Sequence, residues 1–109
     1  MEASFHFKEI DPRTIEGLEK LFKQEMETTI RRHMGKLPVE DAYFHVTVEK
    51  NPHKPQYYVG IALYLPNKNM YARQQEKTPD IAMHKAINSL IKQIDKYREK
   101  FKPNKGGRR

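Results

Sequence analysis

Two neighbouring stretches that alternate between apolar and polar side chains constrain the fold of this chain more than any other feature. In residues 42–50 every second side chain from Phe44 to Val48 is apolar, and residues 56–65 repeat the pattern. A period of two residues is typical of a β-strand with one buried face. The residues between them, 51–55, read Asn-Pro-His-Lys-Pro and favour a turn. The pattern therefore predicts an antiparallel hairpin with one apolar face.

The alternation also predicts which side chains share a face. In the second stretch, the side chains expected in the core are Tyr57, Val59, Ile61, Leu63 and Leu65. On the opposite face, which we expect to be open to solvent, the side chains of note are Tyr43, His45, Tyr58 and Tyr64. An apolar sheet face needs a cover, and two stretches with helical periodicity can supply it.

The first helix is predicted to begin after an N-cap at Asp11, to run to about Met34 and to end at Gly35. The second is predicted to begin after an N-cap at Thr78. Each N-cap precedes a proline, which suits the first helical position because proline has no N–H to leave unpaired. The apolar stripe of the second helix repeats at spacings of four and three residues and consists of Met83, Ile87, Leu90, Ile94, Tyr97 and Phe101.

Two shorter strands, Ala3–Lys8 and Met70–Glu76, complete the element order β-α-β-β-β-α. We expect an α+β fold, a two-layer sandwich in which a four-stranded sheet has both helices packed on one face. Residues 1–102 are predicted to form a single domain. Residues 103–109 contain no apolar side chain to anchor them and are predicted to form a basic, disordered tail.

The charge of the chain is concentrated at its C-terminal end. The chain holds 21 Lys and Arg residues against 14 Asp and Glu residues, a net charge of +7. Residues 96–109 account for +6 of this charge, whereas residues 1–95 are nearly neutral. A basic end on a neutral body favours a polyanionic partner, and nucleic acid is the first candidate.

Three lysines of the second helix, Lys85, Lys92 and Lys96, fall within about 40° of one another on its outward side. A row of this kind can follow a phosphate backbone. Further candidates lie on the first helix and are Lys23, Arg31 and Arg32. Intrahelical pairing offers a structural explanation for part of this helix's charge, because Glu16–Lys20, Glu19–Lys23 and Glu27–Arg31 are spaced as i,i+4 ion pairs.

Several classes of function are excluded or disfavoured. The chain has no cysteine, which excludes disulfides, cysteine-ligated zinc, iron–sulfur clusters and thiol nucleophiles. The five histidines show no metal-binding spacing, and no nucleotide-binding or hydrolase motif occurs. The longest apolar run, residues 57–65, is too short to span a bilayer. We expect a cytoplasmic protein that is no enzyme, with no catalytic residue, cofactor, metal, small-molecule substrate or membrane partner.

The last helix carries a local motif. A known family has a segment there that reads roughly D-x-Y-x-A-I-D-x-x-x-D-K-L-x-x-Q-L-x-K. The matching positions in this chain are Ala82, Met83, Leu90, Gln93 and Ile94. The departures are His84 and Asn88 in place of acidic residues and Ser89 in place of a basic one. With the element order, this segment resembles the family of the ribosome hibernation-promoting factor and ribosome-associated inhibitor A, formerly the sigma-54 modulation proteins.

The resemblance implies a specific function. Members of this family bind the small ribosomal subunit near the decoding region and silence idle ribosomes under stress, with basic residues of both helices on the ribosomal RNA. The residues it points to here are Lys85, Lys92 and Lys96, followed by Lys23, Arg31 and Arg32. Long members add a C-terminal dimerisation domain. A chain that stops at Arg109 would be a short form, expected to be a monomer when free.

Three alternatives remain open. A double-stranded RNA-binding domain has an α-β-β-β-α core, but its second helix usually opens with a lysine cluster, whereas this helix opens Thr-Pro-Asp-Ile-Ala-Met. A protein-interaction module would instead use the tyrosines of the open sheet face. These tyrosines could also stack on unpaired bases, although no RNA-recognition signature accompanies them. The third alternative is a small enzyme whose site the sequence does not reveal. Salt-dependent RNA binding separates the RNA-binding interpretations from protein docking and from an enzyme.

Overall fold

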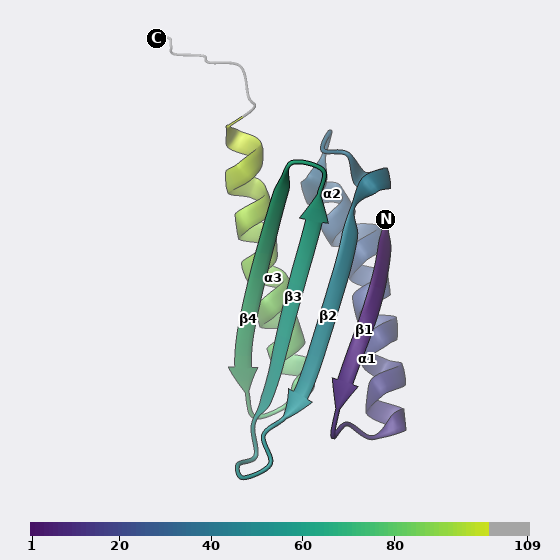
Figure 1. Ribbon diagram of the computed structural model, residues 1–109, viewed down its shortest axis with the longest axis vertical. Helices are drawn as coiled ribbons and strands as arrows, with labels where there is room; N and C mark the ends of the chain where they lie inside the picture. Colours follow the sequence, from purple (N-terminus) through teal and green to yellow (C-terminus); the bar gives the residue numbers. More distant parts are fainter. Residues whose placement is uncertain (101–109) are drawn as a thin grey trace.

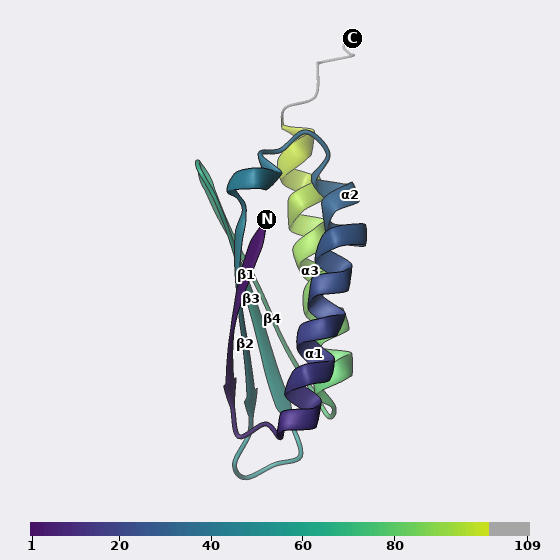
Figure 2. The same ribbon diagram turned by 90° about the vertical axis from the view of Figure 1, so that its right-hand side faces the viewer.

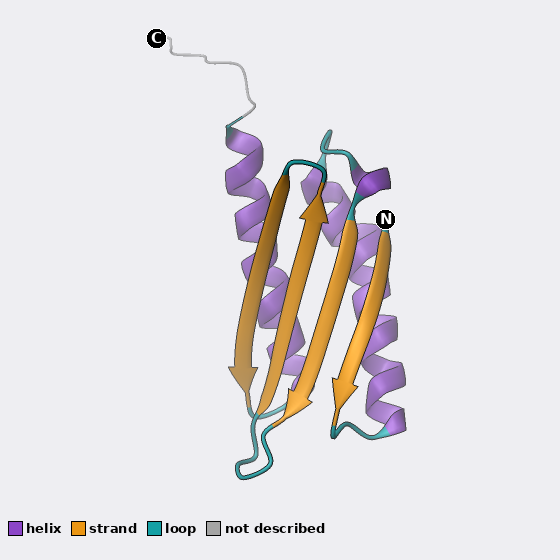
Figure 3. Cartoon of the chain, in the orientation of Figure 1, coloured by secondary structure: helices purple, strands orange, loops and turns teal. Residues whose placement is uncertain are grey.

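The structure is a computed structural model that describes residues 1–100. Phe101 and the tail predicted for residues 103–109 lie outside the described residues. Helices and strands follow one another in the predicted order (Figures 1 and 3). The elements are β1 (Glu2–Lys8), α1 (Pro12–Glu25), a π-helical turn (Met26–Ile30), α2 (Arg31–Met34), a 3-10 turn (Val39–Asp41), β2 (Tyr43–Lys50), β3 (Tyr57–Leu65), β4 (Lys68–Glu76) and α3 (Pro79–Glu99).

The four strands form one sheet in the order β1-β2-β3-β4. β1 runs parallel to β2, whereas the β2–β3 and β3–β4 pairs are antiparallel. The parallel pair requires a crossover, which α1 and α2 provide. Figure 2 shows these helices and α3 side by side on one face of the sheet, with the other face uncovered. The predicted α+β sandwich is therefore confirmed.

The core lies between the sheet and the helices, as the alternation predicted. Phe22 of α1 packs edge-to-face on Phe44 of β2, with ring centroids 5.4 Å apart. Leu90 and Ile94 of α3 are fully buried against the sheet. Two expected core residues differ, because Tyr57 and Tyr97 are only half-buried. Tyr57 is the first residue of β3, next to the hairpin loop.

The N-caps form as predicted. The Asp11 carboxylate accepts a hydrogen bond from the Thr14 backbone N–H at 3.2 Å, and the Thr78 hydroxyl accepts one from the Ile81 N–H at 3.3 Å. Hydrogen bonds from the hydroxyl and backbone N–H of Thr14 lower the pKa of Asp11 below its ordinary value. Both helices thus begin at their prolines because an oxygen-bearing side chain satisfies an unpaired N–H of the first turn.

The first helical stretch is interrupted by a π-helical turn, which the sequence prediction of one regular helix missed. Its buried residues are spaced by four and are Leu18, Phe22, Met26, Ile30 and Met34. Each step of four in an α-helix drifts by about 40° around the axis, so a regular helix would carry Met34 away from the sheet. The wider π turn, Met26–Ile30, offsets this drift and keeps the last two apolar residues in the core.

α2 is fixed to α3 by two polar contacts. His33 Nδ1 lies 2.8 Å from Asp95 Oδ1, and Arg98 donates a hydrogen bond of 2.6 Å to the His33 carbonyl. The chain leaves α2 at Gly35. Its φ of +57° is a backbone conformation that residues with a side chain rarely adopt. A Cβ added at residue 35 would lie only 2.5 Å from a nitrogen of the Arg98 guanidinium. Gly35 is therefore required both by its backbone and by the space it leaves.

Gly35→Ala is expected to destabilise the protein by about 1–3 kcal/mol, because it adds backbone strain and displaces Arg98. Urea unfolding measures the difference. Gly17→Ala is the matched control: a Cβ at this helical position meets nothing within 4 Å, so the change should stabilise by about 0.5–1 kcal/mol. Equal effects of the two substitutions would contradict this assignment to Gly35.

Candidate nucleic-acid interface

The three lysines of the α3 row are all exposed, but their surroundings differ. Lys92 and Lys96 are exposed, and neither forms an ion pair with another described residue. Lys85 is bound to Glu76 at the end of β4, with Nζ 2.7 Å from Oε2. The row thus offers two unpaired ammonium groups and one that a carboxylate already neutralises in part. The sequence placed Lys85 on the correct side of its helix but could not show this contact.

The basic residues of the first helical stretch also have unequal surroundings. Arg31 pairs with Glu27 at 3.0 Å, as the i,i+4 spacing predicted. The predicted pairs Glu16–Lys20 and Glu19–Lys23 are not formed. Lys23 instead holds its ammonium 5.9 Å from the centre of the Phe5 ring on β1. Arg32 is exposed and has neither a hydrogen bond nor an ion pair with the described residues.

The contact between α2 and α3 brings part of the two predicted sets to one end of the helical layer. Arg31 and Arg32 precede His33, which binds Asp95, and Lys96 follows Asp95 on α3. Two acidic residues, Asp95 and Glu99, flank the lysine row in the sequence. The same contact pairs the first of them, Asp95, with the imidazole of His33. Lys85 and Lys23 lie away from this end, one beside β4 and the other beside β1. The predicted residues therefore form an extended basic surface rather than one compact site.

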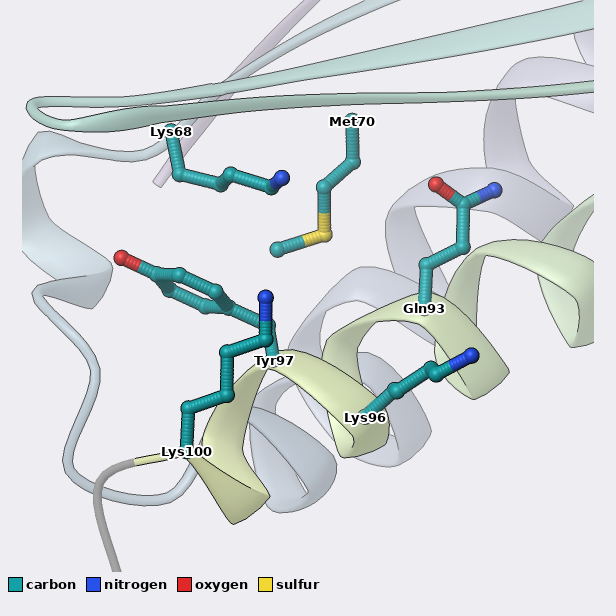
Figure 4. A pocket seen from close by; sticks show the side chains of 6 residues that line it. All are labelled: Lys68, Met70, Gln93, Lys96, Tyr97 and Lys100. Atoms are coloured by element: carbon teal, nitrogen blue, oxygen red, sulfur yellow. The ribbon is translucent and has the colours of Figure 1, made fainter.

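A pocket at the β4 side of α3 was missed by the sequence analysis. It is lined by Lys68, Met70, Gln93, Lys96, Tyr97 and Lys100 and has a volume of about 170 Å³ (Figure 4). Lys68 stands at the start of β4 after the tight turn from β3, so its neighbours on α3 are about thirty positions away in the sequence. The basic composition after residue 95 indicated that Lys100 could contribute to a charged surface. The presence of Lys68 in the same pocket could not be predicted, because it depends on how β4 pairs in the sheet.

The open sheet face carries the predicted tyrosines and one more. Tyr43 and Tyr64 stack with ring centroids 6.1 Å apart, and the Arg73 guanidinium lies 4.7 Å from the centre of the Tyr58 ring. Tyr71 on β4 was not predicted and is the most exposed of these side chains, at 57%. Its position could have been predicted, because Tyr71 stands between Met70 and Ala72, which are both buried. This face is thus aromatic, but its rings partly pack on one another.

The described residues give no sign of a metal site or a membrane span. No group of three or more His, Asp or Glu side chains in residues 1–100 is arranged to hold a metal ion. Among the same residues, no helix has the length and apolar character needed to cross a bilayer.

The fold has clear counterparts among solved structures. No protein-family model and no curated protein matches the sequence. A ribosomal subunit interface protein from Coxiella burnetii superposes with a TM-score of 0.64 at 16% identity, over 91% of this chain and 99% of that one. The N-terminal domain of Protein Y from Thermus thermophilus superposes with a TM-score of 0.58 at 14% identity, over 89% and 99%.

This chain has their fold. The match spans nearly the whole length of both counterparts, so it includes the sheet and both helical stretches together. The fold implied by the resemblance in the last helix is confirmed. At this level of identity, the similarity concerns architecture, and function has to be argued from the surface.

Proposed function

We propose that this protein associates with the ribosome as a hibernation factor and binds the RNA of the small subunit near the decoding region. It acts by binding and not as an enzyme, in the cytoplasm, and inhibits translation by occupying the subunit. The observation that carries the proposal is the whole-chain structural similarity to a protein described as a ribosomal subunit interface protein. The family-like positions Leu90, Gln93 and Ile94 support it independently of the structure.

The surface chemistry agrees with an RNA partner. Lys92 and Lys96 are exposed cations on the outer side of α3, and Arg32 adds a third at the end of α2. Exposed ammonium and guanidinium groups without a carboxylate partner are available for phosphate oxygens. Lys23, Lys85 and Arg31 can join them, but each would first leave a present contact. We therefore rank Lys92, Lys96 and Arg32 ahead of those three.

The extent of the binding unit stays a prediction. A single domain over residues 1–102 with a basic tail over 103–109 would place three further cations, Lys105, Arg108 and Arg109, after α3. The protein-docking alternative would use the opposite, aromatic face of the sheet. The two interpretations therefore involve separate surfaces and predict different responses to salt.

Binding of the protein to purified small subunits is expected to weaken steeply with salt. If about six phosphates are contacted, raising salt from about 50 to 200 mM should weaken binding by about 1,000-fold, because each contact releases condensed counterions. Sedimentation of the protein with small subunits at several salt concentrations measures the slope. Binding that is insensitive to salt would contradict the phosphate contacts and favour protein docking, and absence of binding at low salt would overturn the proposed function.

A further inference from the structure

The pocket between β4 and the last turns of α3 combines positive charge with an aromatic ring. Figure 4 shows the Lys68 and Lys100 side chains on either side of the Tyr97 ring, with Met70 beyond it and Gln93 and Lys96 at the other end. Three of the six lining residues are lysines and none is acidic. Three ammonium groups around one pocket, with no carboxylate among its lining residues, give it a positive potential that favours an anion.

The pocket has an ordered wall as well as flexible charged side chains. Gln93 donates a hydrogen bond of 2.7 Å to the Tyr71 carbonyl on β4, which fixes its side chain between helix and sheet. Met70 is buried with 4% of its surface exposed, so its thioether forms part of the floor. The Lys68 ammonium lies 5.8 Å from the centre of the Tyr97 ring. The ring therefore already serves as a platform for a cation on the face that Lys68 occupies.

We propose that this pocket binds one unpaired nucleotide of an RNA strand, with the phosphate held by Lys68, Lys96 and Lys100 and the base placed against Tyr97 and Met70. Lysine side chains have flexible stems, so Lys68 can turn from the ring to a phosphate oxygen and leave its own place against the ring to the base. Aromatic rings stack on any base, whereas ammonium groups select the phosphate. The pocket would thus favour a nucleotide over either a nucleoside or a free phosphate. This inference deepens the proposed function by naming the part of an RNA that one end of the basic surface takes.

Methionine-methyl NMR on the whole protein tests the proposal with defined probes. Adenosine 5′-monophosphate is expected to shift the Met70 methyl signal through the ring current of its base, and to leave the methyl signals of the buried Met26, Met34 and Met83 in place. Adenosine and inorganic phosphate, each alone, should produce much smaller shifts at the same concentrations. An unmoved Met70 signal, or equal shifts from phosphate and the nucleotide, would overturn the assignment.

Two variants separate stacking from charge. Tyr97→Leu should weaken nucleotide binding by at least about 5-fold, roughly the lower limit for loss of one base–aromatic stack. Tyr64→Leu removes an exposed ring from the opposite sheet face and should leave binding unchanged. Lys68→Gln should weaken the nucleotide and phosphate alike, whereas Lys54→Gln in the β2–β3 loop should affect neither. Thermal unfolding of each variant confirms that it is folded, and equal losses from Tyr97→Leu and Tyr64→Leu would contradict the site.

The outcome is independent of ribosome binding, because a mononucleotide is the probe. If the protein binds the nucleotide near Met70 but does not bind the small subunit, the proposed function is contradicted, whereas nucleotide binding in the pocket is supported. In the opposite result, the nucleotide leaves the Met70 signal of the wild-type protein unchanged, and the Tyr97→Leu variant binds the small subunit as well as the wild-type protein does. This result would contradict nucleotide binding in the pocket without affecting the proposed function.

Discussion

Leu90→Ala is expected to lower the free energy of unfolding by about 2–5 kcal/mol, the cost of cutting a large aliphatic side chain from a packed core. Leu90 has no exposed surface and stands on the sheet-facing side of α3. Its neighbours along the stripe, Ile87 and Ile94, are buried as well, so little solvent can enter to fill the space. The loss therefore combines removed apolar burial with a cavity that the surroundings only partly close.

Urea unfolding of the variant and of a matched control checks this prediction. Ile81→Ala lies on the same helix, but Ile81 is 46% exposed, and this change should cost less than about 1 kcal/mol because much of its side chain is in water. A cost below about 0.5 kcal/mol for Leu90→Ala would mean that the stripe faces solvent. Equal costs at the two positions would likewise contradict the packing of α3 on the sheet.

The sequence predicted the elements whose signals are local. Alternation from Phe44 to Val48 and in the second stretch is a property of the strand itself, so the hairpin and its buried face could be read directly. The caps at Asp11 and Thr78 were predictable for the same reason, because each depends on residues within three positions. The topology followed because one-sided strands and helices have few ways to bury their apolar faces together.

The features that escaped prediction depend on contacts between different elements of the fold. The π turn is set by where the sheet requires Ile30 and Met34, which no local propensity reports. Lys85 meets Glu76 only because the turn into α3 folds back on β4. Lys68 joins Lys96 only through the position of β4 beside α3. The helical spacing therefore predicted that the lysines of the α3 row are exposed, but it could not show that Lys85 already forms an ion pair.

Removing the positive charge of the α3 row is expected to weaken binding to the small ribosomal subunit by about 100-fold or more, because charged contacts to phosphate are lost and repulsion replaces them. The variant combines Lys85→Gln with Lys92→Glu and Lys96→Glu. Glutamine is chosen at position 85 because a carboxylate there would face Glu76 at the distance of the present ion pair. All three side chains point away from the core, so the fold should persist.

The control variant carries the same change of net charge at a different place. It combines Lys8→Gln with Lys50→Glu and Lys54→Glu, three exposed positions at the strand ends and in the β2–β3 loop. Lys68 is left intact in it because this residue lines the pocket beside Lys96. The control is expected to bind with less than about 10-fold loss, since only the long-range attraction between protein and RNA is reduced.

Co-sedimentation of the wild-type protein and the two variants with purified small subunits, at one low salt concentration, tests the central claim most directly. We predict that the wild-type protein and the control variant sediment with the subunit and that the α3 variant stays in the supernatant, with all three equally folded by circular dichroism. Equal loss from both variants would show that bulk charge alone drives association. Full binding by the α3 variant would contradict the interface assigned to this helix.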